Sequence, residues 1–196
     1  MALVLGVNSY VTSAEADVYF TDRLDVAAWT AASDVMKDQA LVTASQWLDT
    51  FRYAGYATSA TQNLSWPRTG SYADSSRGRV IAFDSTYTFT ELDTSSGETF
   101  WTALAALPLE IQRLKKGVFE QAYHLTHNDG LFDTTGQPST STSATDRITV
   151  GSITISGGST TATTVPTRSD VTIQFIRPLL QHGGCLLYTS PSPRDS

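Results

Sequence analysis

The most constraining feature of this 196-residue sequence is the amphipathic segment that follows Pro108. Proline is well tolerated at the first position of a helix. Beyond it, apolar residues recur every three or four positions, at Ile111, Leu114, Val118, Ala122 and Leu125. This spacing places them on one helix face, and Asn128-Asp129-Gly130 then ends the pattern. The sequence therefore predicts a long helix with one buried face.

Two further helices are predicted nearer the N-terminus. Thr12 and Glu15 form a capping-box pattern, which favours a short helix from about Ala14 to Leu24. Ser33-Asp34 caps a second, stronger helix, whose core face is predicted to contain Leu41, Ala44, Trp47, Leu48 and Phe51. A short additional helix is expected in "GETFWTALAAL", directly before Pro108.

Between these helices lies a long segment rich in Gly, Ser and Thr, which is too long for a simple connection. Pro67 restricts the backbone around Trp66, and Gly70 permits a tight turn. We therefore expect a rigid corner that braces this loop, made of Trp66, Pro67, Arg68, Thr69 and Gly70. Alternating β-branched and aromatic residues over Val80 to Phe89 predict a short strand or hairpin arm.

The C-terminal third has a different composition, because more than half of residues 134–167 are Ser or Thr. Such a segment buries little apolar area and is expected to be mobile in isolation. Within it, 147–156 predicts a β-hairpin with a Gly151-Ser152 turn, which needs a surface to pack on. A Ser169 or Asp170 cap then predicts a terminal helix, or two short helices separated at Pro178.

The expected fold is mainly α: a small bundle of three to four helices, with a long loop and a β-hairpin before the C-terminal helix. We divide the chain into a helical core, 1–133, containing an inserted loop, 52–106, and an arm, 134–184, which carries the hairpin and the terminal helix. Residues 185–196 resemble a reading frame of a sequencing adapter, so we exclude them from the fold prediction.

The charge composition argues against a nucleic-acid partner. Thirteen basic and nineteen acidic side chains give a formal net charge of −6, and proteins that act on phosphate backbones are usually basic. The sequence has no apolar run of the length that crosses a membrane and no signal-peptide pattern. We expect a soluble, cytosolic protein without a membrane partner.

Sequence motifs give no sign of catalysis. The chain lacks a phosphate-binding Gly-rich loop, a dinucleotide fingerprint, a nucleophile elbow and a zinc-protease motif. His124 and His127 have a spacing that suits a metal, but no further ligand set accompanies them, which favours polar surface histidines. We predict no catalytic residues, no metal and no cofactor.

Several stretches together resemble a known family. "NSYVTSAEADVYF", "ALVTASQWLDTF", "RYAGY", "LSWPRTG" and "LPLEIQRLKKGVFEQAY" are similar to a family of tailed-phage DnaT-like single-stranded-DNA-binding proteins. Trp66 to Gly70 and the Leu-Pro pair before the third main helix are the most specific of these marks. The segment 71–102 is longer than the family pattern implies. The helical layout with a hairpin is also similar to phage head-to-tail adaptor, or head-completion, proteins.

The two resemblances imply different functions, and the acidic composition favours the adaptor. An adaptor forms a ring of its own copies on the phage portal, contacts tail-side proteins, and lets DNA pass without specific binding. It would assemble in the host cytoplasm and end in the virion neck. The residues expected to dock on such partners are Ile148, Val150, Ile153, Ile155, Val171, Phe175, Leu179 and Leu180.

The alternative is a single-stranded-DNA-binding protein of phage replication, which needs a basic groove with aromatic side chains for base stacking. Tyr56 is one aromatic of that groove, and the other candidates are Arg52, Tyr53, Trp66, Arg68, Arg113, Lys115 and Lys116. In this alternative, alanine at Lys115 and Lys116 is expected to flatten the salt dependence of binding.

Overall fold

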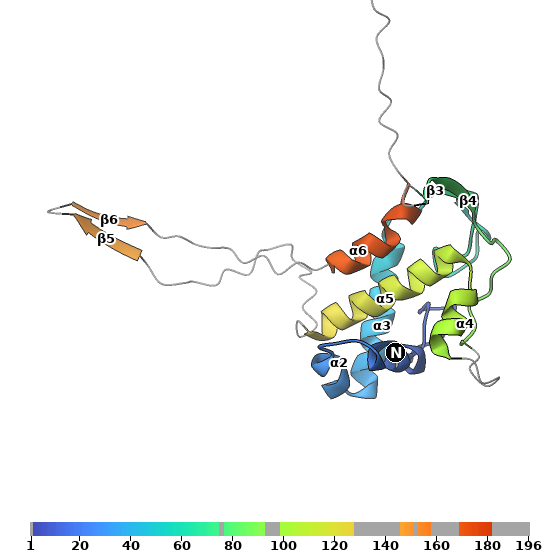
Figure 1. Cartoon of the computed structure of the whole chain (residues 1–196), viewed down its shortest axis with the longest axis horizontal. Helices are drawn as coiled ribbons and strands as arrows, with labels where there is room; N and C mark the ends of the chain where they lie inside the picture. Colours follow the sequence, from blue (N-terminus) through green and yellow to red (C-terminus); the bar gives the residue numbers. More distant parts are fainter. Residues whose placement is uncertain are drawn as a thin grey trace, which may run out of the picture.

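The computed structural model describes residues 2–74, 77–92, 99–127, 146–150, 153–157 and 169–181, with backbone alone for 146–150 and 153–157. About half of these residues are helical (Figure 1). The helices are α1 (Ser13–Thr21), α2 (Ala27–Ala31), α3 (Asp34–Asp49), α4 (Phe100–Ala106), α5 (Leu109–His127) and α6 (Asp170–Ile176), followed by the 3-10 helix η1 (Arg177–Leu179). The fold is thus mainly α, and its described part holds six α-helices where three or four were expected.

The strands form three antiparallel pairs within the described residues. β1 (Tyr56–Ala57) pairs with β2 (Arg68–Thr69), and β3 (Ser71–Asp74) pairs with β4 (Arg79–Ala82). β5 (Asp146–Val150) pairs with β6 (Ile153–Gly157), so the expected hairpin over 147–156 is present in the backbone. Its predicted turn residues, the rest of the Ser/Thr-rich segment 134–167, and 185–196 lie outside the described residues.

The predicted N-caps are confirmed, including that of the terminal helix, where the Ser169 side chain accepts from the backbone N–H of Thr172. The Thr12 hydroxyl accepts from the backbone N–H of Glu15 and the Glu15 side chain accepts from that of Thr12, while Ser33 caps α3. α1 ends at Thr21 rather than near Leu24, because the chain then turns through Asp25, whose φ is +58°. α2 follows this turn and was not predicted.

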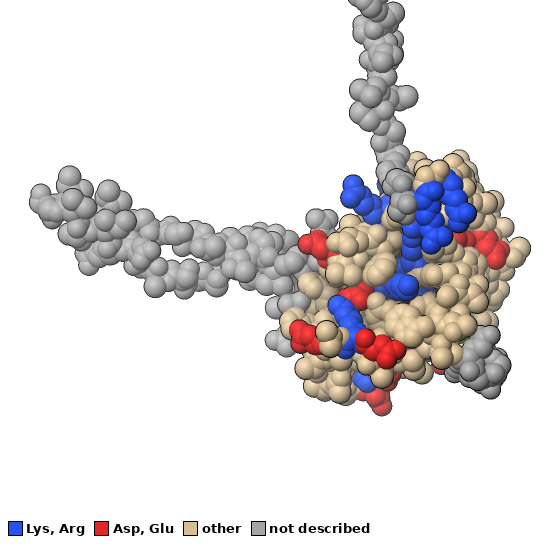
Figure 2. Space-filling view, viewed as in Figure 1, with Lys and Arg blue, Asp and Glu red and all other residues tan. Residues whose placement is uncertain are grey.

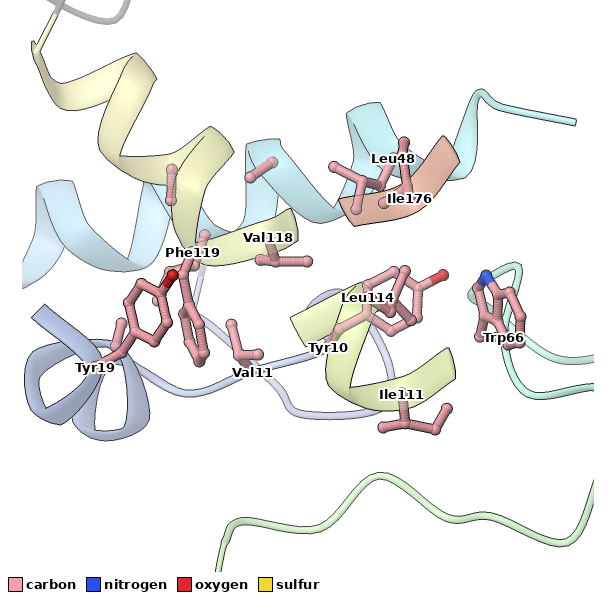
Figure 3. Packing of buried hydrophobic residues seen from close by; sticks show 14 of the residues in the cluster. Tyr10, Val11, Tyr19, Leu48, Trp66, Ile111, Leu114, Val118, Phe119 and Ile176 are labelled. Atoms are coloured by element: carbon pink, nitrogen blue, oxygen red, sulfur yellow. The ribbon is translucent and has the colours of Figure 1, made fainter. Parts of the chain in front are cut away.

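The core is built around α5, as its apolar spacing predicted. All five residues of the predicted face are buried, and Leu114 and Val118 lie within the packed cluster (Figure 3). α3 packs against α5 with Leu41, Ala44 and Leu48 fully buried. Trp47 and Phe51 were expected in this core and lie half-buried at its edge.

α6 packs closely on α5 (Figure 1). A Cβ at Gly117 would stand 3.0 Å from a methyl carbon of Ile176, so the small residue permits the close approach of the two helices. The Thr172 hydroxyl donates to the Gly117 carbonyl at 3.2 Å, and the Ser169 N–H donates to the Gln121 side chain at 3.0 Å. These contacts fix the terminal helix on the body formed by the N-terminal two thirds.

The long segment after α3 is packed by its own aromatic residues. Trp66 is 2% exposed and meets the rings of Tyr53 and Phe83 edge-on, at centroid distances of 5.4 and 4.9 Å. The predicted strand is present only in its first part, because β4 ends at Ala82. The residues that follow are irregular and bury Phe83 and Phe89 instead.

Two glycines allow this segment to fold onto itself. Gly55 has a φ of +69°, and a Cβ there would stand 2.3 Å from the Thr69 carbonyl oxygen. Gly70 has a φ of +129°, and a Cβ there would stand 2.9 Å from the Gly55 Cα. The close pairing of β1 with β2 therefore requires glycine at both positions.

A buried ion pair joins α1, α5 and the segment before α4. The Lys115 ammonium lies 2.8 and 3.1 Å from the two Glu15 carboxylate oxygens, and both side chains are almost completely buried. Glu15 also accepts from the backbone N–H groups of Thr12 and Leu92. The carboxylate is therefore surrounded by donors, which is the condition under which a buried charge is tolerated.

We predict that Lys115→Met lowers the free energy of unfolding by about 3–5 kcal/mol, because it leaves the Glu15 carboxylate buried without a counter-charge. Urea denaturation followed by circular dichroism measures this. A second variant, Glu15→Gln with Lys115→Met, removes the stranded charge and keeps one acceptor oxygen for one of the two N–H groups, of Thr12 and Leu92, so it should recover part of the loss. Lys37→Met, at an ion pair with exposed Asp17, is the control and should cost about 1 kcal/mol or less. Equal losses in the single and double variants would contradict the prediction.

We also predict that the protein loses stability above pH 10. Burial raises the pKa of Tyr87 to about 12, whereas an unfolded tyrosine ionises near pH 10. The unfolded chain therefore loses protons first, and the free energy of unfolding falls as the pH rises from about 10 to 12. Burial is also the main cause of a raised pKa at Tyr10, Tyr19, Tyr53, Tyr72 and Tyr123. Urea unfolding at pH 9 and pH 11 tests this, and Tyr87→Phe should reduce the difference; equal stability at both values would refute it.

Candidate functional site

The structure does not assemble the groove that the sequence suggested for single-stranded DNA. Tyr53 and Trp66 are 3% and 2% exposed, and Lys115 is fully buried against Glu15. None of the three presents a side chain to a ligand at the surface. The expected effect of Lys115→Ala on salt dependence is therefore replaced by an effect on stability, because the ammonium is part of the core.

Arg68 is also used inside the protein. Its guanidinium donates to the backbone carbonyls of Ala54, Gly55 and Ser65, at 2.8, 2.7 and 3.2 Å. These bonds hold the start of β1 next to the Trp66-Pro67 peptide, which is cis. Arg68 thus satisfies several backbone carbonyls of this turn.

Other basic residues gather where β3, β4, η1 and α5 meet. Asp74, at the end of β3, is buried, and one of its carboxylate oxygens lies 2.8 Å from Arg113 on α5 and 3.8 Å from Arg77 in the β3–β4 turn. Arg79 stands opposite Asp74 in the strand register. One carboxylate therefore pairs with two arginines near one end of the hairpin, and a third stands opposite it in the register.

Three more cations join this cluster from other elements. Arg177 lies on η1, which packs against β3. Arg52 accepts a 2.8 Å backbone bond from Gln181, directly after η1. Lys116 lies on α5, three residues beyond Arg113. We call this surface the basic patch, and it consists of Arg52, Arg77, Arg79, Arg113, Lys116 and Arg177.

The patch is separated from most of the acidic surface. Figure 2 shows the Lys and Arg atoms gathered over β3, β4 and the end of α6 and continuing across α5, whereas much of the Asp and Glu surface lies towards α2. Within the described residues, the side chains of Arg52, Arg79, Lys116 and Arg177 make no ion pair. The protein therefore has a positively charged surface region although its formal net charge is −6.

Tyr56 is an exposed aromatic residue on β1. Its side chain is 81% exposed, in contrast to the buried Tyr53 and Trp66 of the same segment. β1 pairs with β2, and Gly70 connects β2 directly to β3 of the basic patch. The ring is thus available for stacking, on the strand ladder that leads to the patch.

The residues expected to dock on protein partners differ in how far they are exposed. Val171 is 40% exposed, Phe175 and Leu180 are half-buried, and Leu179 is completely buried in the core. Leu179 is therefore not accessible to a partner, because η1 turns it towards the body. The side chains of Ile148, Val150, Ile153 and Ile155 lie outside what the structure describes.

The two histidines of α5, His124 and His127, are not part of a metal-binding group in the described residues. The His127 ring stacks on Tyr123, at a centroid distance of 5.7 Å. No group of three or more His, Cys, Asp or Glu side chains in the described part of the chain is placed to hold a metal ion. Likewise, no helix among the described residues is both long and apolar enough to cross a membrane.

Sequence reasoning missed three members of the patch: Arg77, Arg79 and Arg177. Arg77 and Arg79 flank Gly78 in "SSRGRV", a basic turn between two short strands, which is a signal that the sequence does contain. Arg177 gave no such signal, since its neighbours in the patch are about a hundred residues away in the chain.

Comparison with known proteins gives one result for part of the chain. Residues 2–83 match the model of a family described as "Putative DnaT-like ssDNA binding protein". The matched segment runs from the N-terminus to the residue after β4 and includes Tyr56, Arg77 and Arg79. No curated protein and no solved structure matches the chain. The similarity thus concerns the N-terminal 42% of the sequence, and none of these comparisons supports the expected similarity to head-to-tail adaptors.

Proposed function

We propose that this protein binds single-stranded DNA through the basic patch, with Tyr56 as a stacking side chain. The observation that carries the proposal is that six cations lie on elements that meet in the fold, namely β3–β4, η1, α5 and the segment after α3, where Figure 2 shows Lys and Arg atoms gathered. The family similarity of residues 2–83 supports it independently, because the description of that family names the same ligand.

The charge of the patch suits a phosphate backbone. Arg79, Arg177, Lys116 and Arg52 have no carboxylate partner within the described residues, so their charge is available to an anion. Each phosphate neutralised by a cation releases condensed counterions, which drives binding at low salt. The acidic total argued against nucleic acid, but a local field depends on the charges nearest the ligand and is screened beyond about 10 Å.

The exposed ring of Tyr56 favours a single strand over a duplex. Stacking on an aromatic side chain needs a base whose face is free, and bases in a duplex already stack on their neighbours. Any base offers such a face, so the expected binding is tolerant of sequence. The protein is therefore proposed as a binding protein with no catalytic step.

The adaptor function, which the acidic composition of the sequence favoured, is less well supported than the single-stranded-DNA alternative. Ring formation by copies of this chain and docking on a portal have no support among the contacts and comparisons above. The buried position of Leu179 removes one of the residues expected to make such contacts.

The first test is the salt dependence of binding. Fluorescence anisotropy with a labelled oligonucleotide should show that the logarithm of affinity falls linearly with the logarithm of salt concentration. For six phosphate contacts, the magnitude of this slope is at most about 4. Arg79→Ala with Arg177→Ala should reduce the slope by about 1.4. Lys37→Gln lies outside the patch and should leave the slope nearly unchanged. No binding at about 20 mM salt, or equal effects of the patch and control variants, would refute the proposal.

The second test concerns base stacking. Tyr56→Ala is expected to weaken binding by about five- to a hundredfold, which corresponds to the usual contribution of one stacked base. The salt slope should not change, because the side chain carries no charge. Tyr56→Phe keeps the ring and should bind like the unchanged protein. If Tyr56→Ala binds normally, the stacking role assigned to this residue is wrong.

A further inference from the structure

We propose that a hollow next to the Trp66-Pro67 corner receives one base of the bound single strand. This inference rests on the proposed function and adds a separate contact to it. The hollow has a volume of about 430 Å³ and lies between the N-terminal segment, the loop around 58–67 and residues 87–89. Its volume falls within the usual range of about 300–1,000 Å³ for small-ligand sites.

The lining combines apolar and polar side chains. Pro67, Tyr87 and Phe89 provide apolar and aromatic surface, and Thr58, Asn63 and Thr88 provide groups that form hydrogen bonds. A planar heteroaromatic ring with polar edges matches both kinds of surface. A purely apolar ligand would leave the polar groups without partners when it displaced water from them.

The absence of charged side chains from the lining limits the kind of polar ligand that the hollow can bind. None of its lining residues is Asp, Glu, Lys, Arg or His. A phosphate group or a metal ion would therefore lose its hydration there without gaining an opposite charge. A nucleobase is uncharged at neutral pH, so the hollow suits the base of a nucleotide while the phosphates stay on the basic patch.

Asn63 is the side chain best placed to bind the edge of a base. The neighbouring Gln62 is occupied, since its amide accepts from the Ser59 N–H and donates to the carbonyls of Leu64 and Pro67. The Asn63 side chain is exposed, and its amide forms no hydrogen bond within the described residues. An asparagine amide offers both a donor and an acceptor, which can pair with adjacent groups on one base.

The hollow is also close enough to the basic patch for one DNA strand to contact both. Thr58 and Pro67 line it and are joined by a 3.3 Å backbone bond directly beside β1 and β2. From Arg68 the chain runs through Gly70 to Asp74 at the patch, a path of at most about 20 Å for six extended residues. Tyr56 lies beside this path, on β1, where it pairs with Thr69 of β2. Sites for single strands commonly span several nucleotides, so one molecule can reach the hollow and the patch together.

The test compares oligonucleotides with and without bases. An all-thymidine oligonucleotide and an abasic chain of the same length carry the same phosphates, and their affinities are measured by competition at a single salt concentration. Asn63→Ala should weaken binding of the thymidine chain by about three- to tenfold, the usual effect of losing a hydrogen bond. It should leave binding of the abasic chain and the salt slope unchanged. Gln46→Ala, at an exposed amide on α3, is the matched control and should change neither.

Filling the hollow is a second measurement. Thr88→Trp places a large ring at an exposed position of the lining. It should lower the preference for the thymidine chain over the abasic chain. The variant should unfold at the same urea concentration as the unchanged protein, which shows that its fold is intact. If neither Asn63→Ala nor Thr88→Trp alters that preference while salt-dependent binding persists, the hollow is not a base site and the proposed function stands. If no oligonucleotide binds, the proposed function itself has failed.

Discussion

The contact between Glu15 and Lys115 is the interaction on which the arrangement of this protein depends most. The two residues are a hundred positions apart, and their pairing brings the N-terminal cap of α1 to the middle of α5. The same carboxylate accepts from Leu92, so the segment that leads towards α4 is fixed to the same point. A charge buried in this way must be matched by donors from every side, and this requirement leaves little freedom in how the three segments meet.

Asp74 organises the opposite end of the molecule in a comparable way, but with a different result. It is buried like Glu15, yet its partners Arg77 and Arg113 stand at the surface or near it. One carboxylate cannot neutralise both, and Arg79 and Arg177 add charge beside it. The first arrangement removes a cation from the surface, and the second concentrates cations there. This difference is why an acidic protein can present a basic surface.

Prediction of the candidate site from sequence succeeded only in part, for a physical reason that differs between residues. Arg113 and Lys116 were placed on the correct helix, and Tyr56 in the correct loop. Trp66 and Arg68 were expected to brace the long loop and, in the single-stranded-DNA alternative, to form part of a stacking surface. In the folded chain the ring fills the core between Tyr53 and Phe83, and the guanidinium donates to four backbone carbonyl groups. Local sequence does not reveal which polar groups a distant segment will leave unpaired.

The sequence alone determined the elements whose signals are local. The capping box at Thr12, the Ser33 cap, the apolar face of α5 and the β5–β6 pairing all depend on residues within about four turns of one another, and each is present. Tertiary structure alone decided which charges stay exposed. Lys115 and Lys116 are neighbours on one helix, yet a rotation of about 100° per residue directs the first towards Glu15 in the core and the second towards the basic patch. That choice depends on how α1, β3 and η1 pack around α5, and residues so far apart in the chain meet only when the whole core forms.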